Sequence, residues 1–431
     1  MNKPLWFSKS RIWSNQLMRS PNSLQAKYPS SSYKNSPTNA AASGLVVFFV
    51  FPLAPEAAAA PILRSQAIRS PFLTNIHEFF PKFYYITRRY KVEYPCSSRN
   101  AVQKWRGQGM TTYRIGIDLG GTNIKSAVFD SEFQLLLERS DPTEAIRGPG
   151  HVLHLMKTII KQMLRDLAID QNAVLCMGMG IPGLLDPQEG RSIFSPNFPQ
   201  WEDIHVVREM QSEFSFPVWI DNDVRVNLYG EWLFGAGRGY RNIVLLTLGT
   251  GVGSGIVADG RVLYGHTSSA GELGHMNMYR EGRPCRCGSS GCLGRYVSAT
   301  GMVQSLKEEL EAGQPSIISS WIQGEYHRLT SQLISEAYDQ GDALAIEVMH
   351  ETGRLLGFGL SNVINLLNPE LLIIGGGMSA AGDRLLHSVR DTIGKHALKL
   401  SSQGCAVVQA SLGSRAGMVG AAAYAHMRIS R

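Results

Sequence analysis

Residues 113–123 read YRIGIDLGGTN, and residues 242–254 repeat the same pattern as NIVLLTLGTGVGS. In each copy an apolar strand runs directly into a glycine-rich turn, and a second apolar strand follows, at 124–130 and at 254–259. Two such turns could hold a polyphosphate between them, because glycine lets backbone amides approach an anion closely. The repetition therefore predicts two related α/β domains.

Helix and strand patterns alternate through the rest of the chain. The apolar residues of segment 152–167 recur every three or four positions, which is the period of a helix packed on a sheet. Other helices are predicted at 224–234, 300–312, 343–367, 381–396 and 415–427, and other strands at 134–139, 174–181, 218–220, 371–374 and 406–410. Because strands and helices are interleaved, the pattern indicates a mixed α/β protein.

The first 109 residues differ in composition from the remainder. They contain 15 of the 42 Lys and Arg residues but only 3 of the 35 Asp and Glu residues, so the rest of the chain is mildly acidic. They are rich in Ser, Pro and Ala and show no sustained helix or strand period. Three explanations stay open: a translation start at Met110, a disordered tail, or an organellar transit peptide, since the first acidic residue is Glu56.

Cysteine and apolar patterns indicate the cellular setting. Of the six cysteines, three lie within 285–292 and the others are scattered, which suits a reducing compartment better than a disulfide framework. The longest apolar run, 45–53, falls far short of the roughly 20 residues that cross a bilayer. The cysteine pattern predicts a cytoplasmic protein, and the short apolar run predicts that it has no membrane partner. Because the excess of basic residues is confined to the first quarter of the chain, we expect no nucleic-acid partner.

Both glycine turns are candidate phosphate sites. Asp118 precedes the first turn and could hold a metal-bound water, while backbone amides in either turn could contact phosphate oxygens. The turn residues are Gly120, Gly121 and Thr122 in the first copy and Gly249, Thr250, Gly251 and Gly253 in the second. A plain hairpin turn is the alternative. The chain has no GxxxxGK[ST] motif, which excludes a P-loop enzyme, and neither turn opens a βαβ dinucleotide unit, which argues against a dehydrogenase.

A third glycine turn follows an apolar strand. Residues 375–377 are all glycine, and the backbone of Gly376 and Gly377 could lie flat against an adenine or a ribose. A tight turn between a strand and a helix is the alternative.

Asp221, Asn222 and Asp223 end a predicted strand and directly precede a predicted helix. A carboxylate in this position could act as a general base that accepts a hydroxyl proton while a γ-phosphoryl group is transferred. The alternative is that Asp or Asn caps the helix, a role in which both residue types are common. The local sequence alone favours the cap.

Four potential metal ligands have the spacing H-x9-C-x-C-x4-C: His275, Cys285, Cys287 and Cys292. Ligands of this kind and number predict a closed, tetrahedral, structural zinc site. Free thiols beside an unrelated histidine are the alternative. Glu272 lies three residues before His275, so a bound zinc ion could position its carboxylate to face a substrate hydroxyl.

The order of these motifs resembles that of the ROK family of sugar kinases and repressors. The motifs are IGIDLGGTN, GIPG at 180–183, DND, LGTGVGSG, GELGH at 271–275, CRCGSSGCL at 285–293 and IGGG at 374–377. The resemblance covers about 113–426, and SATGMV, NPELLIIGGG and RAGMVGAA look most similar to bacterial ROK glucokinases. It implies a two-domain actin-like ATPase fold, ribonuclease H-like or hexokinase-like, with a structural zinc site. After an extension at 1–110, it implies a smaller lobe at 111–232 plus 417–431 and a larger lobe, with the zinc segment, at 233–416.

The resemblance also implies ligands and residue roles. Asp118 and the two glycine turns would hold Mg²⁺ and the phosphates of ATP, and Gly376 and Gly377 would hold the adenosine. Asp223 would take the proton from the 6-hydroxyl of a hexose, for which glucose is the expected substrate. The sugar would be bound by Gly183, Asn197, Asn222, Asp223, Glu272 and His275. A homodimer is expected.

Two positions depart from the family pattern. Gly294 stands where the family usually has a glutamate that contacts the sugar near its anomeric end, and Val224-Arg225 replaces Ala-Asn after the base. The loss of an acceptor and the gain of a cation predict weaker or altered sugar binding. Kinases of N-acetylmannosamine, N-acetylglucosamine, fructose or allose therefore stay open as alternatives. A ROK-type repressor and an inactive sugar-binding paralogue also stay open, although 1–109 shows no helix-turn-helix pattern.

Overall fold

The computed structural model describes residues 112–195 and 198–429. The N-terminal extension predicted at 1–110 lies outside the described residues, and so does Asn197. Within the two described ranges no helix is long and apolar enough to cross a bilayer.

Two five-stranded sheets share one strand order, so the repeated sequence pattern corresponds to a repeated topology. In each sheet a three-stranded antiparallel meander is extended by two parallel strands. The first sheet contains, in spatial order, β3 (Leu135–Pro142), β2 (Asn123–Phe129), β1 (Tyr113–Leu119), β4 (Val174–Ile181) and β8 (Val218–Asn222). The second contains β11 (Arg261–Val262), β10 (Val252–Ala258), β9 (Ile243–Leu248), β12 (Leu371–Gly375) and β13 (Ala406–Gln409). The predicted mixed α/β fold with two lobes is confirmed.

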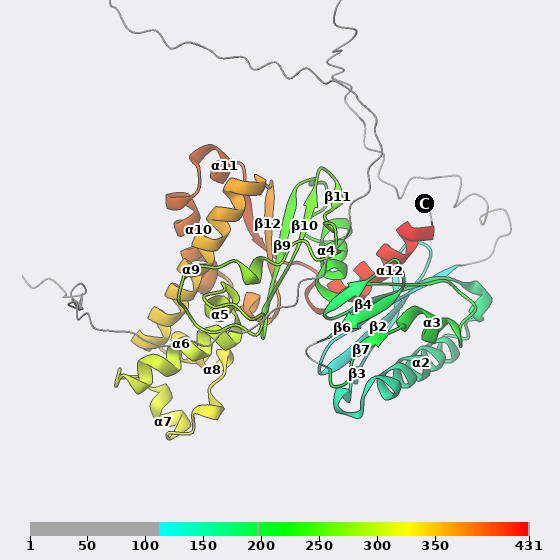
Figure 1. Ribbon diagram of the computed structural model, residues 1–431, viewed down its shortest axis with the longest axis horizontal. Coiled ribbons are helices and arrows are strands. Elements are labelled where there is room, and N and C mark those ends of the chain that lie inside the picture. Colours follow the sequence, from blue (N-terminus) through cyan, green and yellow to red (C-terminus); the bar gives the residue numbers. More distant parts are fainter. Residues whose placement is uncertain (1–111, 196–197, 430–431) are drawn as a thin grey trace, which may run out of the picture. The chain divides into compact units, whose positions relative to one another are not determined.

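Helices cover both faces of the first sheet (Figure 1). On one face α2 (Pro149–Asp166) and α3 (Val206–Gln211) pack against alternate apolar residues of the strands. On the other face, glycine at 116 and 178 lets α12 (Ala416–Ile429) lie directly on the strands. A Cβ atom at either glycine would lie only 1.8 Å from a carbonyl oxygen of α12, so no larger residue fits.

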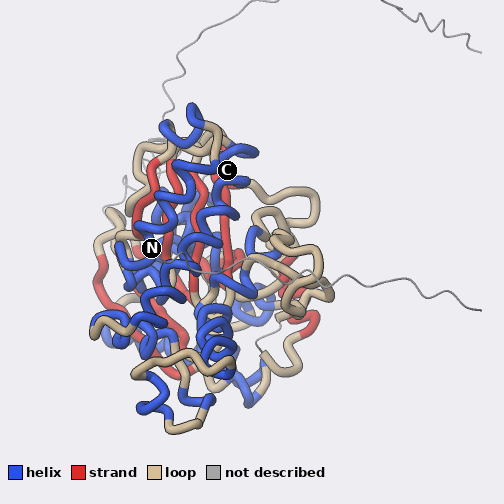
Figure 2. The backbone as a smooth tube through the Cα atoms, turned by 90° about the vertical axis from the view of Figure 1, so that its left-hand side faces the viewer, coloured by secondary structure: helices blue, strands red, loops and turns tan. Residues whose placement is uncertain are grey.

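Helices also cover the second sheet, and Figure 2 shows helices and strands layered on this side of the molecule. One face packs against α6, α8, α9 and α10, and the opposite face packs against α4. These helices are α4 (Asp223–Leu233), α6 (Ala299–Glu311), α8 (Ser331–Asp339), α9 (Ala343–Leu367) and α10 (Asp383–His396). Helix α4 contacts both sheets, because it also packs on β4 and on α12.

Short elements were not predicted. A third, antiparallel sheet consists of β5 (Leu184–Asp186), β6 (Arg191–Phe194) and β7 (Glu202–Ile204). The other short helices are α5 (Gly294–Val297), α7 (Ile318–Ile322) and α11 (Lys399–Gln403), with 3₁₀ turns η2 (Ala145–Arg147), η3 (Gln171–Ala173), η4 (Leu273–His275), η5 (Tyr326–Arg328), η6 (Gly377–Ala381) and η7 (Gly413–Arg415). The helix predicted from 381 begins later, as α10, because η6 precedes it and Gly382 has a φ of 57°.

Two helices, α4 and α12, connect the lobes and pack tightly together. A Cβ atom at Gly420 would lie 1.8 Å from a carbonyl oxygen of α4, and one at Gly230 would lie 2.2 Å from a carbonyl oxygen of α12. Glu231 of α4 is fully buried and accepts hydrogen bonds from residues on both connections. The predicted boundaries of the lobes stay a prediction.

Candidate functional site

Three parallel strands of the first sheet end side by side. The strand register places Asp118 of β1 beside Gly180 of β4, and Gly180 beside Asp221 of β8. The carboxyl ends of parallel strands share one edge of a sheet, where ligands commonly bind. Residues that follow the strands, including Gly183 and Asp223, therefore emerge at the edge that Asp118 occupies.

The start of α4 separates the roles of Asn222 and Asp223. The Oδ1 atom of Asn222 accepts hydrogen bonds from Val224 N at 2.9 Å and from Arg225 N at 3.3 Å, so Asn222 caps the helix. Its Nδ2 atom donates to the carbonyl oxygen of Gly183 at 3.3 Å. The capping interpretation is thus correct for Asn222, while the half-buried carboxyl group of Asp223 lies at the first helical position.

The carboxyl group of Asp223 interacts electrostatically with two other carboxyl groups, which come from separate segments. Burial, assisted by the charge of Asp223, raises the pKa of Asp118 to about 7. Burial raises the pKa of Asp223 to about 6; adjacent backbone N–H groups and Arg225 oppose the rise, and the charge of Glu272 adds to it. Asp118 and Glu272 therefore both lie within electrostatic reach of Asp223. Carboxyl groups that titrate near neutral pH are typical of functional sites.

The first glycine turn joins β1 to β2 and is anchored by Thr143. The Thr143 hydroxyl donates to the Gly120 carbonyl oxygen at 2.7 Å, and Thr143 N donates to the Thr122 carbonyl oxygen at 2.9 Å. Gly121 is exposed, and a Cβ atom there would meet no atom of the described chain within 4 Å. The base of the turn is therefore fixed, and the space beside it can admit a phosphate group.

The second glycine turn joins β9 to β10 and is anchored in the same way by the start of α6. Ala299 N donates to the Gly249 carbonyl oxygen at 2.9 Å, and the Thr300 hydroxyl donates to the Thr250 carbonyl oxygen at 2.8 Å. Cβ atoms at Gly249 and Gly251 would again have no neighbour within 4 Å among the described residues. Both turns therefore combine a fixed backbone with open space.

Close packing requires glycine at positions 253 and 376, because a Cβ atom at either would overlap a neighbouring residue. A Cβ atom at Gly253 would lie 2.4 Å from the Val224 side chain, so glycine lets β10 approach the first turn of α4. Gly376 has a φ of 80°, and its Cβ atom would overlap the backbone of Leu248, which directly precedes the second glycine turn. The third glycine turn therefore lies against the second, and Gly377 has open space beside it.

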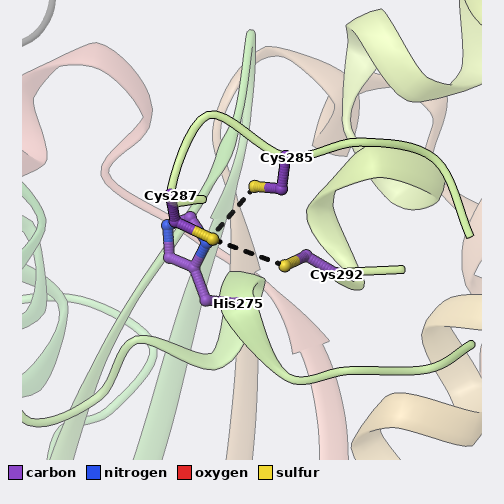
Figure 3. Close-up of side chains that lie close together, drawn as sticks. All are labelled: His275, Cys285, Cys287 and Cys292. Atoms are coloured by element: carbon purple, nitrogen blue, oxygen red, sulfur yellow. Dashed lines mark hydrogen bonds between the residues drawn. The ribbon is translucent and has the colours of Figure 1, made fainter. Parts of the chain in front are cut away.

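The side chains of His275, Cys285, Cys287 and Cys292 point toward one another (Figure 3). Their ligand atoms all lie within 4.8 Å of one another. The Sγ atoms of Cys287 and Cys292 are 3.7 Å apart, and Cys285 Sγ is 3.6 Å from His275 Nδ1. A tetrahedron with bonds of about 2.3 Å to sulfur and about 2.0 Å to nitrogen places ligand atoms about 3.5–3.8 Å apart. The four residues therefore fit a closed zinc site.

The zinc cluster adjoins two residues that matter for the sugar site. The short helix η4 places Glu272 one turn before His275, as predicted, and His275 N donates to the Glu272 carbonyl oxygen at 3.0 Å. Helix α5, which follows the cluster, begins at Gly294. A Cβ atom at Gly294 would lie 3.2 Å from the carbonyl oxygen of Gly274 and 3.6 Å from the Val252 side chain, so position 294 lies next to the turn that carries Glu272 and His275.

We expect the purified protein to contain about one zinc ion per chain. Cys287 suits a ligand role, because its Sγ atom lies 3.7 Å from that of Cys292, a separation that fits two sulfur ligands of one zinc ion. Elemental analysis of Cys287→Ser should show at least about tenfold less bound zinc than the wild type. Cys405→Ser, which alters a partly buried thiol outside the cluster, should retain the metal. Full zinc occupancy in Cys287→Ser would contradict the assignment.

Arg225 does not add a free cation to the site, so this part of the sequence-based prediction is wrong. Its side chain is buried, and its Nε atom donates to Asp221 Oδ1 at 2.6 Å. The sequence did contain one signal for this pairing, since Asp221 and Arg225 are four residues apart, the spacing of ion pairs along a helix. Because Asp221 belongs to a strand rather than to the helix, the helical rule for such pairs did not apply.

Two surface cavities lie away from these residues. One of about 440 Å³ is lined by α2 and α3, and one of about 510 Å³ is lined by α9 and α10. Neither contains a candidate site residue. The candidate site rests instead on the carboxyl groups at the strand ends, the glycine turns and the zinc cluster.

Comparisons with known proteins agree with this arrangement. The model of the ROK family matches residues 114–428. A glucokinase of Halalkalibacterium halodurans is 34% identical over 308 residues, which cover 71% of this chain and 92% of that protein. The crystal structure of a ROK family glucokinase from Streptomyces griseus, in complex with glucose and AMPPNP, has a TM-score of 0.63 and 30% identity, and the match covers 73% of this chain and 99% of that one.

A regulator is also similar to this chain. The structure of a ROK family transcriptional regulator, a homologue of the E. coli MLC protein, has a TM-score of 0.66 and 26% identity, covering 78% of this chain and 84% of that one. The predicted two-lobed, actin-like fold is confirmed by these matches, and the His-Cys₃ cluster is consistent with the zinc site of the family. Since the family match spans both sheets, the glycine turns and the zinc cluster, this chain belongs to the ROK family.

Proposed function

We propose that this chain is an ATP-dependent hexose kinase that phosphorylates the 6-hydroxyl group, with glucose as its substrate. The observation that carries the proposal is the carboxyl group of Asp223, whose pKa is raised to about 6 beside Asp118 and Glu272. Phosphoryl transfer to an alcohol needs a carboxylate that accepts the hydroxyl proton. A raised pKa makes Asp223 a stronger proton acceptor than an ordinary aspartate.

The remaining candidate residues would bind the two substrates. Asp118 would hold Mg²⁺, which neutralises charge on the phosphates when it is bound, and its repulsion with Asp223 suits a cation site. Backbone amides of 120–122 and 249–253 would contact the phosphates, and Gly376 and Gly377 the adenosine. The sugar would be held by Gly183, Asn197, Asn222, Asp223, Glu272 and His275.

The extent of the matches supports a kinase. The chain covers 92% and 99% of the two glucokinases described above but 84% of the regulator. The shared part thus accounts for nearly the whole length of a kinase, whereas more of the regulator lies outside the match. A sugar-sensing repressor stays the second candidate, because the two kinds of protein share the sugar-binding fold.

The homodimer and the cytoplasmic location stay predictions, and no step of the proposed reaction depends on them.

Zinc-loaded protein should be supplied with Mg-ATP and followed by ADP release with glucose, N-acetylglucosamine, N-acetylmannosamine, fructose, mannose or allose. We expect the highest kcat/KM with glucose. A higher value with another sugar would reassign the substrate within the same reaction. Absence of turnover with every sugar would contradict the kinase, and salt-dependent binding to duplex DNA would then favour the repressor.

Gly294→Glu should lower the KM for glucose. Position 294 lies next to Gly274, between Glu272 and His275, and a carboxylate there would supply an acceptor for a sugar hydroxyl. One hydrogen bond to a charged group corresponds to a KM about tenfold lower, with little change in kcat. Gly394→Glu, at an exposed position of α10 with free space beside it, is the matched control and should have no effect. An unchanged KM in Gly294→Glu would show that position 294 does not contact the sugar.

A further inference from the structure

Residues 263–272, here called the Glu272 segment, follow β11 and end at Glu272. Arg225 of α4 contacts this segment, since its Nη1 atom donates to the carbonyl oxygen of Ser268 at 2.8 Å. Ser268 has a φ of 57°, a conformation that residues other than glycine seldom adopt. Arg225 therefore donates its hydrogen bond to the residue of the Glu272 segment that has this left-handed backbone conformation.

Tyr264 links the Glu272 segment to Asp221, which is the ion-pair partner of Arg225. Its hydroxyl donates to Asp221 Oδ2 at 2.6 Å, while Asp221 Oδ1 accepts from Arg225 Nε at 2.6 Å. The guanidinium carbon of Arg225 lies 5.0 Å from the centre of the Tyr264 ring, within cation–π range. Asp221 is fully buried and Arg225 is 5% exposed. The Asp221–Arg225 pair thus holds the Glu272 segment at two points, in surroundings that exclude water.

Asp221 and Arg225 also flank the proposed base, Asp223, in the sequence. Asp221 lies two positions before Asp223 and Arg225 two positions after it, while Glu272 ends the segment that the pair holds. A shift of the Glu272 segment would change the separation between the carboxyl groups of Glu272 and Asp223. Any ligand that contacts both groups would then fit less well.

We propose that Arg225 is a positioning residue that fixes Glu272 relative to Asp223, and thereby sets the affinity for the sugar. The proposal rests on the proposed function, which identifies the ligand of both carboxylates as a hexose. Arginine suits the task because its planar fork contacts a carboxylate and a carbonyl oxygen at once, whereas lysine presents a single ammonium group. The contact with Ser268 distinguishes this role from that of a simple buried ion pair.

Arg225→Lys keeps a positive charge beside Asp221 but cannot reproduce both contacts. We expect faster hydrogen–deuterium exchange in 263–272 and a dissociation constant for glucose, measured without ATP, that is raised about tenfold. The KM for glucose should rise in parallel, and the KM for ATP should change by less than about twofold. Arg390→Lys is the matched control, because Arg390 likewise contacts a carboxylate, that of Asp383, and a carbonyl oxygen, that of Val407, outside the Glu272 segment. It should change none of these quantities.

Two results would overturn the positioning role: unchanged exchange in 263–272, or faster exchange with unchanged affinity for glucose. Failure of the wild type to bind or phosphorylate any sugar of the panel would refute the proposed function and with it the link to the sugar. The exchange data would still decide separately whether Arg225 holds the Glu272 segment. If Arg225→Lys does not fold, Tyr264→Phe provides a second variant. It removes the hydrogen bonds of the Tyr264 hydroxyl to Asp221 and Tyr229 but leaves the Asp221–Arg225 ion pair, so it should give the same changes at smaller size.

Discussion

Replacing Asp223 with Asn is expected to lower kcat/KM for sugar phosphorylation by about 10²- to 10⁴-fold, the range that a positioned general base contributes. Asparagine has nearly the size of aspartate, and the cap of α4 belongs to Asn222, so the fold should persist. Glucose affinity measured by calorimetry should change far less than kcat. Asp166→Asn, on the exposed side of α2, is the matched control and should keep full activity.

The pH dependence of the wild type provides a companion test of the same residue. Only ionised Asp223 accepts a proton, so kcat/KM should fall about tenfold per pH unit below the pKa of about 6. At saturating Mg²⁺, which would keep Asp118 ionised, the residual activity of Asp223→Asn should lack this acidic limb. Substantial turnover by Asp223→Asn, or a wild-type profile that stays flat down to about pH 5, would show that another group is the base.

Glu231→Ala is expected to lower the free energy of unfolding by about 2–4 kcal/mol. Glu231 is fully buried, and it forms no ion pair within the part of the chain that the structure describes. Its Oε1 atom accepts from Leu412 N at 2.7 Å, and its Oε2 atom accepts from Ala236 N at 2.9 Å and Ser411 N at 3.1 Å. These donors lie on both connections between the lobes, so alanine would leave partly buried N–H groups without an acceptor.

Urea unfolding followed by circular dichroism measures this loss. Glu347→Ala, at an exposed position of α9, is the matched control and should change the free energy of unfolding by no more than about 0.5 kcal/mol. Glu231→Gln keeps one oxygen acceptor and should fall between the two. If Glu231→Ala is as stable as the control, the carboxylate does not hold the two connections together.

Long elements could be predicted from the sequence, because their apolar period is sustained over many residues. The helix predicted at 343–367 and the strand predicted at 174–181 coincide with α9 and β4. The strands β5 and β7 contain three residues each, too few to display an alternation. Pairing with β6 defines them, and the local sequence does not reveal that pairing.

Within the site, residue types were predictable and pairings were not. Motif spacing pointed to Asp223 and to the cluster around His275, because phosphate transfer and zinc binding restrict the residue types that can serve. The burial of Arg225 against Asp221 depends on where both side chains point. Tyr264, which completes the contact, lies 43 residues from Asp221 in the chain, and no local pattern indicates such a partner. The role of Asp223 as the base stays a prediction.

The product formed from glucose and Mg-ATP tests the hexose kinase activity most directly. Phosphorus NMR of the reaction mixture identifies which sugar oxygen carries the new phosphate and how much ADP accompanies it. We predict a hexose 6-phosphate in equal amount to ADP. ADP formed without a sugar phosphate, a phosphate on another oxygen, or glucose left unchanged by zinc-loaded protein would contradict the proposal that Asp223 activates the 6-hydroxyl group of glucose.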